Sequence, residues 1–557
     1  MEIRKINDSY GVAPQISRDD VSMIAAAGYR AIICNRPDGE GNDQPLFREI
    51  AEAAEAAGLP VHYLPVTSGK ISDDDVQAFD RLFAGLPKPV LAFCRTGTRS
   101  ETLWSHSGAA ADMRAQALDA AKAQDLDTSP AARHVANQNR AGASPAQHHF
   151  DIVIVGGGSA GVSVAASLLQ RAGDLDIAII DPADVHYYQP GWTLVGGGAF
   201  EAEETARPMS AVIPRKVKRI RAGVAAFEPD QNAVLLEDES RLTYGRLIVC
   251  PGLKLDWNAI DGLAETLGKN GVTSNYRFDL APYTWRLVQE LKSGVALFTQ
   301  PPMPIKCAGA PQKAMYLSAD HWWRKGCLNA IDVSFCNAGQ VLFGVKEYVP
   351  ALMEYVGKYN LDLALGQNLV SIDGPAHKAV FATTDENGNV THVERHFDMI
   401  HVCPPQSAPD FIKVSPLADD AGWVDVDPDT LRHKSFDNIW SLGDVMNAPN
   451  AKTAAAVRKQ APIVARNILV DMGRLRGVAH YDGYGSCPLT VERGKIVLAE
   501  FGYGGKLLPS FPGWLIDGTR PSRLAWLLKE KILPPVYWHL MLKGREWLAR
   551  PRVSGVN

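Results

Sequence analysis

The sequence of 557 residues contains no run of eighteen uninterrupted apolar residues, so we expect no helix that spans a membrane. The first residues lack the apolar core of a secretory signal, and no long basic run predicts a nucleic-acid partner. The eight cysteines form no Cys-x-x-Cys pair and no framework spacing, so we expect neither structural disulfides nor a bound metal. These absences are typical of a cytoplasmic protein that uses its thiols individually.

A glycine-rich turn that follows an apolar run is the strongest motif present. Residues 150–155 lead into Gly156-x-Gly158-x-x-Gly161, which predicts a buried strand, a tight turn and a helix whose N-terminus binds a pyrophosphate. A second apolar strand, at 177–180, ends in Asp181, where a ribose hydroxyl needs an acceptor. The spacing predicts a dinucleotide site that includes Gly156, Gly158, Ser159, Ala160, Gly161 and Asp181.

Residues 1–128 alternate short apolar strands with helical segments, a pattern that predicts an α/β domain. The strand at 89–93 leads into the loop Cys94-Arg-Thr-Gly-Thr-Arg99. Backbone N–H groups and two arginines around a cysteine stabilise its thiolate and bind an anion. Four residues separate Cys94 from Arg99, whereas cysteine phosphatases use Cys-x5-Arg. The shorter loop resembles that of rhodaneses, which carry a persulfide on the cysteine.

This whole first domain resembles the phosphatase-like family that is found fused to β-lactamase-fold hydrolases. The resemblance rests on the segments 14–15, 35–40, 65–69 and 94–100. It leaves both phosphatase and sulfurtransferase activity open, and we favour sulfur transfer, with Cys94 as the nucleophile and Arg99 as the anion-binding cation. After it, residues 129–148 carry prolines, small residues and amides without apolar periodicity, and they predict a flexible linker.

Two later segments favour FAD over NAD as the dinucleotide. The strand at 244–249 ends in Cys-Pro-Gly252, which resembles the Ala-Thr-Gly segment of flavoproteins with two dinucleotide domains. A further strand ends in Gly443-Asp444 and resembles their second FAD motif, where the aspartate accepts a ribitol hydroxyl. The strand at 294–298 leads into a proline-rich segment with Cys307 rather than a second glycine motif, so we expect an electron donor other than a nicotinamide.

Residues 149–548 resemble mitochondrial-type sulfide:quinone oxidoreductase. The segments that carry this resemblance are 186–190, 306–316, 343–346, 421–427, 452–457 and 481–489. It implies a tandem Rossmann-like flavoprotein fold, FAD, ubiquinone as the electron acceptor, and Cys307 as a redox cysteine beside the flavin. It also implies that Gln189 and Pro190 contact the cofactor and that Lys452 lies near the flavin, where a cation stabilises the reduced ring.

The sequence departs from this family in one respect. The resemblance implies a second redox cysteine directly after Gly443-Asp444, but Val445 occupies that position. Cys403 is a conceivable substitute, although we favour a buried spectator role for it. We expect the same spectator role for Cys327, Cys336 and Cys487.

The stretch from Pro521 predicts two short helices, broken at Pro534-Pro535, with the Trp, Leu and basic residues of an element that lies in the lipid headgroup plane. We expect its removal to leave the flavin bound. The predicted organisation is therefore an α/β phosphatase-like domain at 1–128, a linker at 129–148, a tandem Rossmann-like flavoprotein at 149–520, and a membrane-associating segment at 521–557.

Together these features predict an enzyme that oxidises sulfide at Cys307 and passes electrons through FAD to ubiquinone. The sulfane sulfur leaves to a small thiol such as glutathione, or to Cys94. We expect a peripheral protein on the cytoplasmic face of the inner membrane, and whether it forms a homo-oligomer stays open. The alternatives are an NAD(P)H-dependent disulfide or persulfide reductase with a phosphatase head, and a non-catalytic, membrane-bound persulfide sensor.

Overall fold

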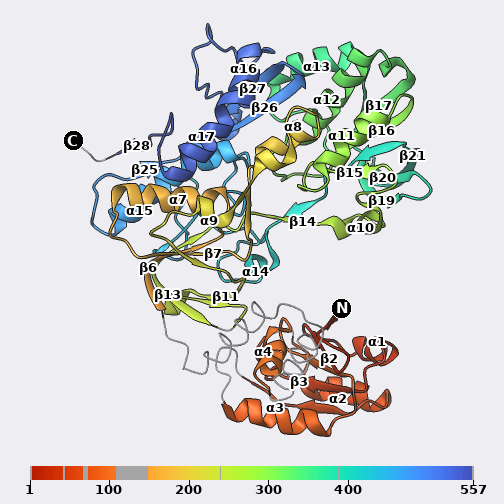
Figure 1. The fold of residues 1–557 in the computed structure, drawn as a ribbon, viewed down its shortest axis with the longest axis vertical. Helices are drawn as coiled ribbons and strands as arrows, with labels where there is room; N and C mark the ends of the chain where they lie inside the picture. The colour runs from red at the N-terminus through yellow and green to blue at the C-terminus, as the bar shows by residue number, and fades with distance from the viewer. Residues whose placement is uncertain are drawn as a thin grey trace, which may run out of the picture. The chain divides into compact units, whose positions relative to one another are not determined.

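The structure is a computed structural model that describes residues 3–41, 44–66, 73–107, 148–238, 240–385 and 388–554. They form two compact units, one with the N-terminal residues up to His149 and 222–243, the other with 150–221 and 244–554 (Figure 1). The predicted linker up to residue 147 and residues 108–128 of the predicted first domain lie outside the described residues. Both units combine helices with largely parallel sheets, so the predicted α/β class is confirmed.

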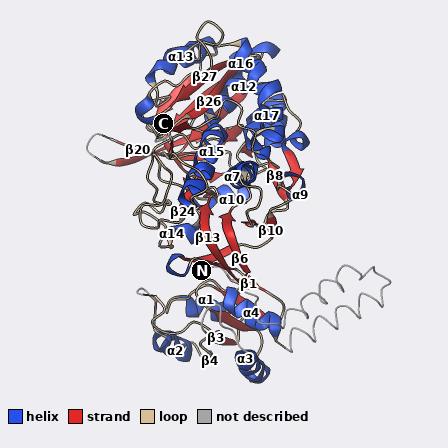
Figure 2. Ribbon diagram, turned by 90° about the vertical axis from the view of Figure 1, so that its left-hand side faces the viewer, coloured by secondary structure: helices blue, strands red, loops and turns tan. Residues whose placement is uncertain are grey.

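A five-stranded sheet of order β1-β2-β5-β3-β4 organises the first unit. β1 pairs antiparallel with β2, and the other pairs are parallel. Alternate residues of the central strands face two separate apolar cores, which helices cover (Figure 2). The elements are β1 (Arg4–Lys5), β2 (Tyr10–Ala13), α1 (Asp20–Ala26), β3 (Ala31–Cys34), α2 (Phe47–Ala56), β4 (Val61–Tyr63), α3 (Asp73–Gly85), β5 (Val90–Phe93) and α4 (Thr98–His106).

The first sheet of the second unit has the order β10-β7-β6-β13, with β24 parallel to β13. The hairpin β11–β12, whose residues are grouped with the first unit, pairs with β13 through β12. Its central strands are buried and apolar along their length, as is typical of a parallel sheet covered by helices. The helices α7 and α15 pack against each other. The elements are β6 (His148–Val155), α7 (Ser159–Arg171), β7 (Ile177–Ile180), β10 (Lys218–Ile220), β11 (Val224–Glu228), β12 (Ala233–Leu236), β13 (Arg241–Val249), β24 (Ile439–Ser441) and α15 (Ala454–Asp471).

A second parallel sheet, of order β15-β22-β16-β17-β18, forms the other half of this unit. The antiparallel strands β19 to β21 lie beside it, and α12 packs on it and on the hairpin β26–β27. The elements are β15 (Val272–Thr273), α11 (Ala281–Glu290), β16 (Gly294–Gln300), α12 (Ala310–Lys325), β17 (Ile331–Asn337), α13 (Val349–Lys358), β18 (Asp362–Leu365), β19 (Asn368–Asp373), β20 (Lys378–Thr384), β21 (Val390–His396), β22 (Met399–His401), β26 (Gly485–Glu492) and β27 (Lys495–Phe501).

The remaining named helices and strands of this unit are shorter. These are β8 (Val185–Tyr187), α8 (Trp192–Val195), β9 (Ala206–Pro208), α9 (Met209–Val212), β14 (Lys254–Leu255), α10 (Leu263–Thr266), β23 (Gln406–Ser407), α14 (Asp410–Lys413) and β25 (Ala479–His480). Among the described residues, no helix is long and apolar enough to cross a membrane.

The C-terminal stretch is integrated into the second unit. It comprises α16 (Arg523–Leu527), a π-helical turn (Leu528–Ile532), α17 (Leu533–His539) and β28 (Arg552–Val553), which pairs with β25. The Tyr537 hydroxyl lies 2.6 Å from Nε2 of buried His186, and Trp538 is only 4% exposed. The two prolines that were expected to break the helices occupy the first turn of α17. The prediction that this stretch serves lipid rather than core is therefore wrong for α17.

Candidate active site

The glycine motif forms the tight turn that its spacing predicts. Gly156 follows β6 with φ of 106°, and a Cβ there would lie 2.4 Å from the Cys250 carbonyl oxygen. A Cβ on Gly161 would lie 1.9 Å from the Gly156 carbonyl oxygen, so only glycine allows α7 to begin so close to the turn. Gly158 has no atom near its missing Cβ and opens onto a cavity at the N-terminus of α7.

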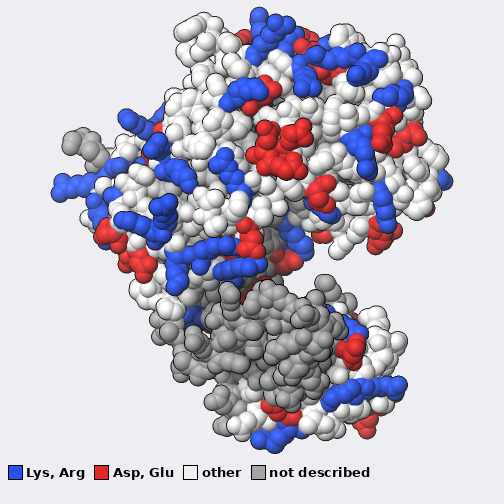
Figure 3. Space-filling view, in the orientation of Figure 1, with Lys and Arg blue, Asp and Glu red and all other residues white. Residues whose placement is uncertain are grey.

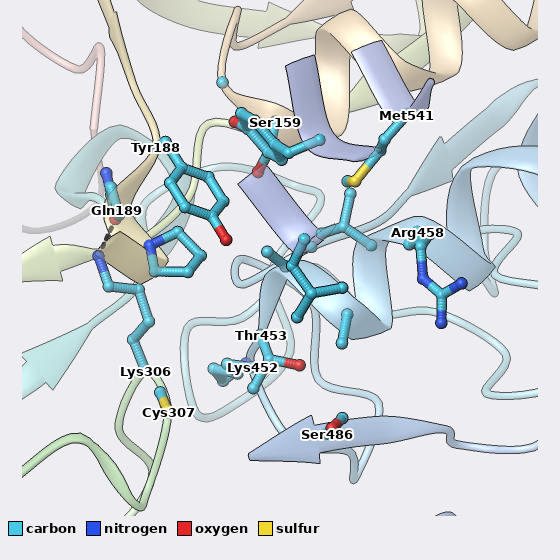
Figure 4. A pocket seen from close by; sticks show the side chains of 18 of the residues that line it. Ser159, Tyr188, Gln189, Lys306, Cys307, Lys452, Thr453, Arg458, Ser486 and Met541 are labelled. Atoms are coloured by element: carbon cyan, nitrogen blue, oxygen red, sulfur yellow. Dashed lines mark hydrogen bonds between the residues drawn. The ribbon is translucent and has the colours of Figure 1, made fainter. Parts of the chain in front are cut away.

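One cavity in the second unit brings the predicted cofactor residues together (Figure 4). Asp181 ends β7, and its carboxylate accepts hydrogen bonds from the N–H groups of Gly157 (2.6 Å) and Ala183 (2.8 Å). Gly252 and Gly443 adopt positive φ angles of 82° and 83° at the ends of β13 and β24. The predicted residues that line the cavity are Gly158, Ser159, Ala160, Asp181, Gln189, Pro190, Gly252, Cys307, Gly443, Asp444 and Lys452.

Charges face the cavity beside the Gly-Asp turn. Burial raises the pKa of Asp444, against the opposing effect of Lys306 and Lys452. Burial also lowers the pKa of Lys452 to about 8, and its ammonium donates to the carbonyl oxygens of Asp444 (2.7 Å) and Met446 (2.9 Å). Lys306 hydrogen-bonds the Gln189 side chain across the cavity (Figure 4). The predicted lysine therefore lies at the Gly-Asp turn, with its ammonium anchored on backbone carbonyls.

Cys307 lies between β16 and the N-terminus of α12, where the helix dipole favours a thiolate. Its N–H donates to the Lys452 carbonyl (2.9 Å), and its own carbonyl accepts from Ala310 N (2.7 Å). These bonds hold the residue at φ of 53°, a left-handed conformation that non-glycine residues rarely adopt. Its half-buried side chain faces the cavity in a backbone position fixed on both sides.

The Cys307 sulfur lies 4.0 Å from the sulfur of Cys487, which β26 presents from the opposite side. Cys487, for which a spectator role was expected, therefore lies beside the predicted redox cysteine. Val445, at the position expected for the second redox cysteine, is a fully buried apolar residue. Cys403 packs in the same cluster as Cys307, but burial raises the pKa of its thiol to about 12. The sequence carried no local signal for this pair, because 180 residues separate its members.

Two buried lysines surround the thiol pair. Lys313 Nζ lies 3.1 Å from the Cys307 sulfur, and Lys529 Nζ lies 3.4 Å from the Thr490 hydroxyl and from the Pro488 carbonyl oxygen. Within the described chain, neither ammonium hydrogen-bonds a carboxylate. A hydrogen bond from Cys487, followed by the charges of Lys313 and Lys529, lowers the pKa of Cys307 well below its usual value. The same contact raises the pKa of Cys487, so Cys307 is the thiolate of the pair.

The first unit holds a separate cysteine site. Cys94 is buried at the end of β5, and its sulfur accepts a hydrogen bond from Gly97 N (3.1 Å) at the start of α4. Arg99 is buried as well, but its guanidinium pairs with Glu40 (2.9 Å) and donates to the Asn35 carbonyl (3.1 Å). Glu40 also pairs with Arg36 (2.9 Å). The predicted anion-binding arginine thus already has a carboxylate partner, which motif spacing did not reveal.

Both parts of the chain match families of known proteins. Residues 150–288 match the family described as pyridine nucleotide-disulphide oxidoreductase. Mitochondrial sulfide:quinone oxidoreductase of Mus musculus is 40% identical over 399 residues, which cover 72% of this chain and 88% of the mouse protein. The chain belongs to the sulfide:quinone oxidoreductase family. The fold agrees, since the crystal structure of sulfide:quinone oxidoreductase from Aquifex aeolicus superposes with a TM-score of 0.57 at 19% identity, covering 72% of this chain and 91% of that one.

A further domain precedes this part of the chain. Residues 2–111 match the phosphatase-like domain of β-lactamase hydrolase-like protein. The β-lactamase hydrolase-like protein of Xylella fastidiosa is 38% identical over 107 residues, which cover 19% of this chain and 25% of that protein. Both predicted family resemblances are therefore confirmed, each over its own part of the chain.

Proposed function

We propose that this protein oxidises sulfide with bound FAD and reduces ubiquinone. The observation that carries the proposal is Cys307, which lines the cavity that the glycine motif opens into, with Lys313 Nζ 3.1 Å and the sulfur of buried Cys487 4.0 Å from its own sulfur. The cavity fits FAD. The N-terminus of α7 lies at the cavity and would bind the pyrophosphate, and the carboxylates of Asp181 and Asp444 would accept hydrogen bonds from the ribose and ribitol hydroxyl groups. When bound, the flavin supplies a two-electron acceptor for thiols and a donor for quinone.

The two cysteines divide the sulfur chemistry between them. In the oxidised protein they form a cystine, and hydrosulfide attacks one of its sulfur atoms. The new S–S bond leaves a persulfide on the attacked cysteine, and the other cysteine leaves as a thiolate that carries the electron pair of the broken bond. Lys313 and the α12 N-terminus stabilise a thiolate on Cys307, so we assign Cys307 as the leaving group and Cys487 as the persulfide carrier.

The persulfide then passes its outer sulfur to a small thiol. The acceptor thiolate attacks the outer sulfur, a small persulfide forms, and Cys487 is released as a thiolate that takes up a proton. Lys529 and Lys313 favour anions at this position, since both are buried without a carboxylate partner in the described chain. Re-forming the cystine from the Cys307 thiolate and the Cys487 thiol gives up one proton and two electrons, which bound FAD would accept, and it returns the pair to its starting state.

For the first domain, we propose sulfur transfer at Cys94. Its thiolate would take the outer sulfur of glutathione persulfide, releasing glutathione, and pass that sulfur to a second nucleophile. The Gly97 N–H at 3.1 Å and the buried position at the start of α4 support a persulfide at this cysteine. In the full-length protein, Cys94→Ser should abolish thiocyanate formation from glutathione persulfide and cyanide. Aryl phosphate hydrolysis that outpaces sulfur transfer in the wild type would favour the phosphatase alternative.

Anaerobic titration of the flavin separates the candidate functions of the second unit. Sulfide should bleach the flavin of the full-length protein, and a ubiquinone analogue should restore it. Bleaching by NADH but not by sulfide would favour the reductase alternative, and no bleaching by either would favour a sensor. Because ubiquinone is dissolved in lipid, this function also requires work at a membrane surface.

A further inference from the structure

The cysteine site of the first unit lies where neighbouring strands of its sheet end. Cys94 follows β5, and Asn35 and Arg36 follow β3, which pairs with β5 in parallel. The Asn35 N–H donates to the Phe93 carbonyl oxygen (2.8 Å), so the ends of the two strands lie side by side. Ligands of parallel sheets bind at this edge. The residues that follow β3 therefore lie beside the candidate nucleophile.

One carboxylate holds two buried guanidinium groups at this edge. Glu40 Oε1 accepts a hydrogen bond from Arg99 (2.9 Å), and Glu40 Oε2 accepts one from Arg36 (2.9 Å). The side chains of Arg99 and Arg36 are only 4% and 8% exposed. Arg36 also donates to the Gln15 side chain (2.9 Å), and Arg99 donates to the Asn35 carbonyl oxygen (3.1 Å). Both oxygens of Glu40 are thus occupied, and the three charged side chains are fixed relative to one another.

This arrangement is unfavourable for an oxyanion. A guanidinium binds phosphate most strongly when it offers two parallel N–H groups. In Arg99, the two terminal nitrogens already donate to Glu40 and to Asn35, and within the described chain only Nε has no partner. An incoming dianion would have to displace the carboxylate of Glu40 or lie against it, and like charges in contact are costly.

The surface of the first unit that Figure 3 shows outside the grey atoms carries both signs of charge. Lys and Arg atoms are interspersed there with Asp and Glu atoms, rather than gathered in one wide basic patch. Wide patches of one sign are what concentrate charged substrates near a site. The affinity for an oxyanion therefore depends on the arginines at the site itself, and Glu40 controls both of them.

A persulfide makes different demands on Cys94. In the proposed transfer, the Cys94 thiolate attacks the outer sulfur of glutathione persulfide and the S–S bond of the donor breaks. Glutathione leaves as a thiolate with the electron pair of that bond, and the outer sulfur keeps its proton. The attacked sulfur carries no charged oxygen. Transfer from thiosulfate, in contrast, releases sulfite, and a phosphate ester brings its charged oxygens into the loop.

We propose that Glu40 is a specificity-determining residue that excludes phosphate esters and thiosulfate from Cys94 and leaves the site to persulfides. The two guanidinium groups and the one carboxylate retain one net positive charge, which favours a thiolate at Cys94. The choice of a persulfide as the donor rests on the proposed sulfur transfer, whereas the exclusion of oxyanions does not.

Alkylation of Cys94 in the full-length protein measures oxyanion binding without turnover. The reduced protein is treated with iodoacetamide at increasing concentrations of inorganic phosphate, and the modification of Cys94 is followed by mass spectrometry. Glu40→Gln should need at least about tenfold less phosphate for half-maximal protection than the wild type, because it releases both arginines from a carboxylate. Glu40→Asp, whose shorter side chain does not span both guanidinium groups, should shift in the same direction. Glu52→Gln, which removes an exposed carboxylate from α2, is the matched control and should behave like the wild type.

Donor preference provides a second measure. The ratio of thiocyanate formed from thiosulfate to that formed from glutathione persulfide should rise at least about tenfold in Glu40→Gln. Equal protection by phosphate in Glu40→Gln and the wild type would overturn the proposal, as would an unchanged donor ratio. Weaker protection in Glu40→Gln would also overturn it, because Glu40 would then orient the arginines to bind an anion. A wild type that transfers no sulfur from either donor, alongside the expected protection pattern, would refute only the proposed sulfur transfer.

Discussion

The contact between Lys313 and Cys307 allows a quantitative prediction. The ammonium lies 3.1 Å from the sulfur, and a hydrogen bond to a charged group contributes about 1.5–3 kcal/mol. Since one pKa unit corresponds to about 1.36 kcal/mol, loss of this contact should raise the pKa of Cys307 by about one to two units. The sign follows from the charge, because the ammonium favours the thiolate and Lys313→Met removes it. At a pH below the original pKa, the thiolate fraction should then fall about tenfold for each unit of the shift.

The pH dependence of alkylation measures this shift. The full-length protein is reduced, treated with iodoacetamide across a pH series, and the modification of Cys307 is followed by mass spectrometry. Lys529→Met is the matched control, because it also removes a buried ammonium but not one that contacts the Cys307 sulfur. It should shift the profile in the same direction by a smaller amount. Superimposable profiles of Lys313→Met and the wild type would refute the proposed electrostatics.

Three further groups of variants test the cysteines, the glycine turn and the C-terminal stretch. Cys487→Ala and Cys307→Ser should both retain flavin and lose sulfide-dependent bleaching, whereas Cys403→Ala should bleach normally. Rapid bleaching of Cys487→Ala by sulfide would exclude Cys487 as a partner of Cys307. Gly161→Ala should yield protein without flavin absorbance, because its Cβ would lie 1.9 Å from the Gly156 oxygen. Removal of the chain after Arg520 should also lose flavin, because it deletes Tyr537 and other residues of the cavity wall; a truncated protein with an intact flavin spectrum would contradict this.

Local patterns were sufficient to predict the dinucleotide cradle. The strand β6, the turn at Gly156 and the acceptor at Asp181 lie within about thirty residues, and each depends on steric limits that a short sequence displays. The contact between Cys307 and Cys487 depends instead on how the hairpin β26–β27 packs against α12, which no short segment of sequence displays. Which face of β26 carries Cys487 toward Cys307 follows from tertiary packing. The pair of Arg99 with Glu40 escaped prediction for the same reason.

Composition also could not separate surface from core near the C-terminus. Trp514 and Trp538 both lie in segments rich in tryptophan, leucine and basic residues, yet one is 85% exposed and the other 4%. The difference arises because α17 packs against β8 and the residue that follows it, where His186 and Tyr188 contact Tyr537. The aromatic residues of α17 therefore pack in the cavity wall, whereas Trp514 in the preceding loop is exposed.

The electrostatics of the thiol pair explain why two lysines are buried there. Burial disfavours an ammonium and lowers the pKa of Lys529 well below its usual value. Like-charge repulsion from Lys313 lowers this pKa further. The thiolate on Cys307 opposes this shift, and a second anion beside the lysines would oppose it further and favour the charged form of Lys529. An additional anion is stabilised there, and the two anions of the proposed cycle, hydrosulfide and the acceptor thiolate, both react as nucleophiles. The lysines that lower the pKa of the Cys307 thiol would thus also attract the anionic nucleophile. In the proposed cycle, the same charges bind the substrate and make Cys307 the leaving group.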